Sequence, residues 1–147
     1  MTRRWTRSVL VAALGWLLVL AGTVLPWTSN RAGRSTWLVE VAERHPLLIT
    51  QYVGALVVLG IGLAMLVLGA PTSTVLLPAV AGALTLLGVV LATPRPEAIT
   101  IGADAFGRTF ETYDQTTWSA GPASVVLGGL LMVAVAVSYA RTRRRPE

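Results

Sequence analysis

The chain has 147 residues, of which 54% are hydrophobic and only 13% are charged, and it contains no cysteine. A soluble domain usually carries about a quarter charged residues, so this composition indicates an integral membrane protein, and the lack of cysteine excludes disulfides and thiolate chemistry. The net charge of +5 would suit a nucleic-acid ligand, but the arginines lie at the ends of hydrophobic stretches, so we expect no nucleic-acid partner.

Four uncharged hydrophobic stretches are each long enough to cross a bilayer core of about 30 Å as a helix. These predicted spans are 8–27, 47–70, 75–93 and 121–140. They predict an all-α integral membrane protein, an antiparallel four-helix transmembrane bundle. The rest of the chain is too short for a second hydrophobic core. We therefore expect one transmembrane domain over 1–147, with outside loops 28–46 and 94–120 and cytoplasmic tails 1–7 and 141–147.

Small residues recur along the first predicted span at Ser8, Gly15 and Gly22. A seam of this kind lets another helix approach closely, so we expect Gly15 and Gly22 to pack against a neighbouring helix. Arginines at 3, 4 and 7 precede the span and favour a cytoplasmic N-terminus. The segment also has the charge pattern of a signal peptide, but its apolar run continues to Trp27, beyond a typical signal core. Trp27 is expected at the membrane interface.

The loop after the first span contains an amphipathic segment at 36–44. We expect a short helix there with Ser35 as its N-cap, because a serine hydroxyl accepts hydrogen bonds from amides of the first turn. Trp37 falls on the apolar face and Glu40 on the polar face. The helix should therefore lie along the outer membrane interface.

Glu40, Glu43 and His45 lie close together in the sequence, and His45 is the only histidine. A metal or proton-relay site is one interpretation. Metal sites usually need three or four convergent ligands, so we favour a solvated helix end.

The second and third spans are joined by a tight turn at 70–74, which makes them antiparallel neighbours. Gly60 and Ala64 form a pair of small residues, four apart, that suits close helix contact. None of the predicted spans contains Asp, Glu, Lys, Arg or His. Proton-coupled pumps use ionisable groups inside the membrane, so the sequence argues against transport by this chain alone.

The second outside loop is rich in β-forming residues, and we expect a small β-hairpin at 98–113. Two strands alone are marginally stable, so the hairpin should pack on the first loop or on the helix ends. Asp104, Glu111 and Asp114 in this loop do not match a calcium-loop pattern, and a glycosidase carboxylate pair would need a spatial convergence that sequence does not show. We interpret them as solvated acids.

The last span carries a stripe of small residues that includes Ser124 and Gly128. We expect this stripe to be a helix-packing face. The arginine-rich run at 141–145 follows the span directly and should attract anionic lipid. Seven arginines flank the two predicted inner ends against five in the longer outside loops, so both termini are predicted to be cytoplasmic.

The overall pattern resembles uncharacterised small actinobacterial four-helix membrane proteins, of the type associated with the tryptophan operon. The resemblance rests on an arginine-rich start, Leu25-Pro26-Trp27, Ser35-Thr36-Trp37-Leu38, Gly121-Pro122 and an arginine-rich tail. It implies a bacterial plasma membrane location and provides no catalytic residues to transfer.

The sequence therefore predicts a non-enzymatic accessory or assembly factor that presents two outside loops to a membrane protein partner or to a second copy. The candidate interaction surface comprises Trp37, Glu40, Glu43, His45, Asp104, Glu111, Asp114 and Trp118. The alternative is a small carrier or lipid-binding protein for neutral or apolar cargo. One histidine and no cysteine leave few groups for acid–base or nucleophilic catalysis, and we expect no cofactor or metal.

Overall fold

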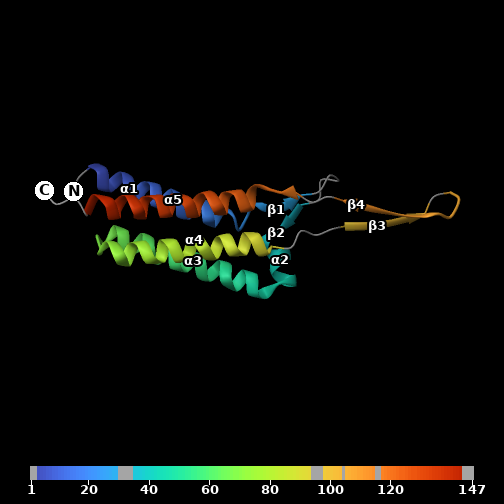
Figure 1. Ribbon diagram of the computed structural model, residues 1–147, viewed down its shortest axis with the longest axis horizontal. Helices are drawn as coiled ribbons and strands as arrows, with labels where there is room; N and C mark the ends of the chain where they lie inside the picture. Colours follow the sequence, from blue (N-terminus) through green and yellow to red (C-terminus); the bar gives the residue numbers. More distant parts are fainter. Residues whose placement is uncertain (1–2, 30–34, 94–97, 104, 115–116, 144–147) are drawn as a thin grey trace.

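The computed structural model describes residues 3–29, 35–93, 98–103, 105–114 and 117–143. This part of the chain is mostly helical, with five helices and two small antiparallel sheets. Figure 1 shows the long helices side by side, with both termini at one end and the strands at the other. We call the end with the termini and the α3–α4 turn the turn end, and the opposite one the sheet end.

Four helices run between these two ends. They are α1 (Arg3–Ala21), α3 (Pro46–Val67), α4 (Thr72–Ala92) and α5 (Ala120–Arg143). Three of them, α3, α4 and α5, are long and apolar enough to cross a membrane, whereas the apolar part of α1, Thr6–Ala21, is shorter. Helix α1 packs along α5, α3 packs along α4, and α4 also contacts α5.

Helices α3 and α4 are joined by the tight turn expected from the sequence. Gly69, with φ of 68°, follows the end of α3, a left-handed conformation that glycine adopts without steric cost. The amide of Ala70 donates to the carbonyl of Met65 at 3.0 Å, and the amide of Gly69 donates to Leu66 at 3.1 Å. This pattern is the Schellman motif, which satisfies carbonyls at the helix end. Helix α4 then starts at Thr72, so Pro78 lies inside it rather than in its first turn.

The first predicted span is wrong at its C-terminal end, because α1 ends at Ala21 and Pro26–Ser29 form strand β1. Proline cannot donate a helical hydrogen bond and disfavours helical geometry in the residue before it. The indole nitrogen of Trp27 then donates to the carbonyl of Gly22 at 2.7 Å, so the chain folds back over the helix end. Apolar composition alone did not reveal this reversal.

A three-stranded antiparallel sheet closes the sheet end, and the sequence did not predict it. Strand β1 pairs with β2 (Ser35–Trp37) on one side and with β5 (Thr117–Trp118) on the other. Thr28 in β1 lies opposite Thr36 and Trp118. The sheet therefore joins two loops that are far apart in the sequence.

The short helix expected after the first span exists as α2 (Leu38–Arg44), but two details differ. Ser35 lies in β2 and Trp37 occupies the N-cap position, where its amide donates to a carboxylate oxygen of Glu40 at 3.4 Å. The buried face consists of Leu38 and Val41, while Trp37 is exposed. Ser35 pairs with Ser29 of β1 and lies two residues before the N-cap position, so it does not cap α2.

The predicted hairpin is present as β3 (Ala98–Ala103) and β4 (Thr109–Asp114), paired antiparallel from Ala98↔Asp114 to Ala103↔Thr109. Its expected packing is wrong: Figure 1 shows the hairpin projecting away from the helices and from the three-stranded sheet. An isolated two-stranded ribbon is only marginally stable in water.

Candidate functional site

The charged residues predicted near α2 are all exposed. Glu40, Glu43 and His45 lie at the surface of α2 or just after it. Within the described residues, groups of three or more His, Asp or Glu side chains that could hold a metal ion are not found. These residues therefore lie on an exposed helix surface, close in the sequence to the exposed Trp37.

The acids of the second loop are distributed along the hairpin. Asp104 lies outside the described residues, and Glu111 and Asp114 are positions of β4 opposite Ile101 and Ala98. Because this hairpin projects away from α2, the structure does not bring these acids together with the α2 residues into one site (Figure 1).

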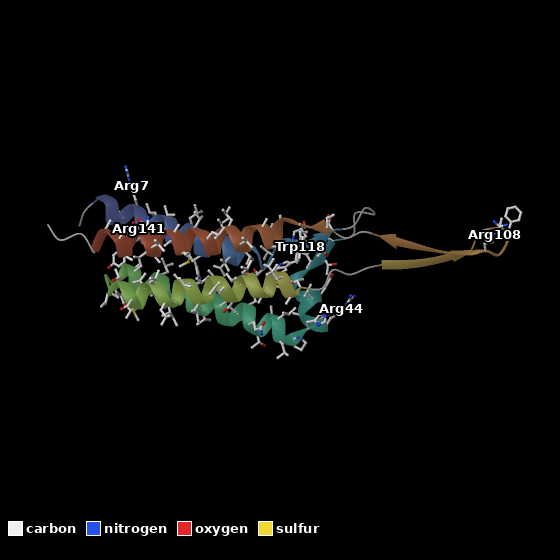
Figure 2. The ribbon with its side chains drawn as sticks, viewed as in Figure 1. Arg7, Arg44, Arg108, Trp118 and Arg141 are labelled. Atoms are coloured by element: carbon white, nitrogen blue, oxygen red, sulfur yellow. The ribbon has the colours of Figure 1, made fainter. Side chains whose placement is uncertain are left out.

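The tip of the hairpin presents an aromatic side chain that the sequence analysis did not select. Phe106 is 87% exposed, and it is followed by Gly107, with φ of 74°, and by the exposed Arg108. Figure 2 places Arg108 at the far end of the molecule from Arg7 and Arg141. Phe106 is thus a large apolar group exposed at the tip of the projecting hairpin.

Trp118, the last member of the predicted surface, is half-buried in β5 and packs against the hydrophobic core. Trp27, which the sequence analysis expected at the membrane interface, is completely buried within the protein. Its ring meets that of Tyr52 edge to face, with centroids 5.9 Å apart. A Cβ atom on Gly121 would lie 2.8 Å from the Trp27 ring. Trp27 of β1 therefore contacts both α3, through Tyr52, and α5, through Gly121.

The small residues of the first predicted span lie against α5. A Cβ on Gly15 would lie 2.8 Å from the Gly128 carbonyl oxygen, and one on Gly22 would overlap the Val125 side chain. The hydroxyl of Ser124 donates to the carbonyl of Leu18 in α1 at 2.6 Å. Glycines at this contact allow the two backbones to approach closely.

Helix α1 is also hydrogen-bonded to α3. The indole nitrogen of Trp16 donates to the Leu56 carbonyl at 3.1 Å, and the hydroxyl of Tyr52 donates to the Val19 carbonyl. A Cβ on Gly60 would lie 3.3 Å from the same indole nitrogen. Each of these bonds ties a polar group to the backbone of the neighbouring helix.

The expected contact at Ala64 is wrong, because Ala64 is exposed. The close contact between α3 and α4 uses Gly62 and Gly82 instead. A Cβ on Gly82 would lie 2.7 Å from Leu59, and one on Gly62 would lie 3.5 Å from Pro78. Gly60 faces α1, so Gly60 and Ala64 do not act as one pair.

Comparisons with protein-family models, with curated proteins and with solved structures found no significant match.

A groove lies between α4 and α5 and is lined by side chains of both helices. Its deeper part has a volume of about 220 Å³ and an apolar lining that includes Ala83, Leu87, Val126 and Gly129. A wider hollow of about 720 Å³ adjoins it at the sheet end, and Val126 lines both. The wider part also has polar lining residues, Thr93 and Ser119. Such a groove can receive an apolar chain with a polar end.

Proposed function

We propose that α1 crosses the membrane together with α3, α4 and α5, so that the protein is an antiparallel four-helix transmembrane bundle. The apolar part of α1 is shorter than the others, but its contacts support this arrangement. Gly15 and Gly22 lie against α5, and Trp16 is hydrogen-bonded to α3. A helix packed this closely against two membrane-spanning helices shares their lipid environment.

We further propose that the turn end is cytoplasmic and that the protein resides in a bacterial plasma membrane. Arg7 and Arg141 are exposed at this end, near both termini (Figure 2). Arginines that flank membrane spans are preferentially retained in the cytoplasm, where they attract anionic lipid. The hairpin and the three-stranded sheet would then be extracytoplasmic.

The natural lack of cysteine gives a direct test of this orientation. Arg108→Cys and Thr142→Cys each introduce a single exposed thiol, one at the hairpin tip and one at the turn end. A membrane-impermeant maleimide should label position 108 in intact cells and position 142 only after lysis. The reverse pattern would overturn the proposed orientation.

The proposed function is that of a non-enzymatic accessory or assembly factor, which presents its extracytoplasmic strands to a membrane protein partner. The observation that carries it is the exposed Phe106 at the tip of a projecting hairpin. Exposed aromatic residues frequently serve as anchors of protein interfaces. A two-stranded hairpin is only marginally stable alone, and a partner that packs on it would supply the missing contacts.

In-cell photo-crosslinking tests this function. A photoreactive phenylalanine analogue at position 106 should form a discrete protein adduct that is competed by excess protein with native Phe106. The matched control is the same analogue at Leu68, which is 79% exposed at the turn end. Adducts at both positions, or only lipid adducts at 106, would contradict the proposal.

The alternative function is that of a lipid-binding protein or small carrier for apolar cargo. One specific observation favours it, the apolar groove between α4 and α5. A carrier for apolar molecules needs no ionisable group inside the membrane, so the uncharged helices are compatible with this alternative.

A further inference from the structure

The α4–α5 groove opens sideways, along helices that are both long and apolar enough to lie within the membrane. Small residues of the two helices face each other in its lining, since a Cβ on Gly129 would lie 3.6 Å from the Cβ of Ala83. Leu84 and Leu130 form its rims and are more than half exposed. The groove therefore has small residues in its lining and bulky apolar side chains along its edges.

The length of the groove corresponds to one membrane leaflet. On α5 its lining runs from Pro122 to Val133. Eleven helical residues rise about 16 Å, which is close to half of a hydrocarbon core of roughly 30 Å. The groove therefore starts at the sheet end and extends over about half of the hydrocarbon thickness of a bilayer. A further hollow toward the turn end meets it at Val80, but that hollow is lined by residues of α4 alone and is a helix face rather than a groove.

The polarity of the groove changes once along this length. The deep part is apolar, while the mouth at the sheet end includes Thr93, Trp118 and Ser119. The lining residues of both parts are uncharged. The Thr93 hydroxyl donates to the Val89 carbonyl at 2.7 Å, so Trp118 and Ser119 give the mouth its remaining polar lining. This distribution suits an amphiphile that has an apolar chain and a neutral polar segment, such as the ester region of a phospholipid.

We propose that this groove binds one acyl chain of a phospholipid from the leaflet at the sheet end, with the ester region of the lipid at the Thr93–Ser119 mouth. A transmembrane helix of another chain fits less well. Helices associate closely through small residues, but the rims here are leucines, and a helix is about 10 Å wide with its side chains. This site does not depend on the partner proposed for the hairpin.

Native mass spectrometry with a blocking variant tests the site. Val126 lines both parts of the groove, so Val126→Trp should obstruct it. Val53→Trp is the matched control, because Val53 is 50% exposed on α3 at a similar distance from the sheet end. The wild type should retain one dioleoylphosphatidylglycerol molecule after exchange into lipid-free detergent. Val126→Trp should lower this retention at least about tenfold, whereas Val53→Trp should leave it unchanged.

The headgroup provides a second comparison. Because the groove lining is uncharged, dioleoylphosphatidylcholine should be retained to the same extent as dioleoylphosphatidylglycerol. Retention of the anionic lipid alone would overturn the proposal and assign the lipid to a headgroup site. Equal retention by the two tryptophan variants would show only an unspecific lipid shell, and would overturn it as well.

Photolabelling of the wild-type protein keeps the proposal testable even where Val126→Trp does not fold. A phosphatidylcholine with a diazirine in the middle of one acyl chain should label peptides of α4 and α5 in preference to those of α3. Uniform labelling of the three helices would overturn the site. Size-exclusion chromatography with light scattering measures the oligomeric state of the same variants. If the wild type were a dimer and Val126→Trp a monomer, the groove would bind a second copy of the chain, and the proposal would be overturned.

Discussion

Replacement of Gly128 by alanine tests the contact between α1 and α5 most directly. A Cβ at this position would overlap the carbonyl oxygen of Gly15 and would lie 3.0 Å from the amide nitrogen of Val19. Both are backbone atoms, so neither can rotate away, and α1 as a whole must shift. That shift also strains the hydrogen bond from Ser124 to Leu18.

The expected change in the free energy of unfolding is the sum of two destabilising contributions and one stabilising contribution. Overpacking of a tight contact costs about 1–3 kcal/mol, and a backbone clash belongs at the upper end. Loss of the interhelical hydrogen bond adds about 0.6 kcal/mol in a membrane protein. The better helix propensity of alanine offsets about 1 kcal/mol. We therefore expect Gly128→Ala to lower the free energy of unfolding by about 2–3 kcal/mol.

Gly88→Ala is the control for helix propensity. Gly88 lies in α4, and a Cβ there would meet nothing within 4 Å. The same substitution should therefore raise stability by about 0.5–1 kcal/mol. Unfolding by dodecyl sulfate in mixed micelles, followed by circular dichroism, measures both variants. If Gly128→Ala were as stable as Gly88→Ala, the close packing of α1 on α5 would be refuted.

Three further substitutions have defined outcomes in the same assay. Thr28→Val should stabilise the protein by about 1 kcal/mol, because the buried Thr28 hydroxyl has no hydrogen-bond partner within the described chain; a loss of stability would reveal a partner. Ser124→Ala should cost about 0.6 kcal/mol through its bond to α1, while the exposed Ser138→Ala should have no measurable effect; equal effects would contradict this bond. Trp27→Phe should cost about 1–3 kcal/mol by leaving the Gly22 carbonyl unpaired, and a neutral result would show that this bond is dispensable.

The parts of the fold that depend on local sequence were predicted well. The lengths of the apolar runs located α3, α4 and α5 to within a few residues, and the β-forming residues and turn residues located the hairpin. The end of α1 was missed because it depends on Trp27 folding back to bond Gly22. The apolar composition of the run does not reveal that the chain leaves the helix after Ala21, where Trp27 then bonds back to Gly22.

The interaction residues were harder to predict than the helices. Phe106 was overlooked because one aromatic residue in a loop carries no periodic signal, and its importance comes from the projection of the hairpin. The sequence also did not predict the groove between α4 and α5. Its residues, such as Ala83 and Gly129, come from two helices and have no recognisable spacing within either one.

By itself, the sequence determined that α3, α4 and α5 are long and apolar enough to cross a membrane, because the bilayer demands a fixed length of apolar residues. The tertiary structure decided which faces of those helices meet. In a soluble helix polar residues mark the outer face, but a helix in lipid is apolar on all sides. The choice of Gly62 rather than Ala64, and the pairing of β1 with β5, therefore depend on packing between distant segments.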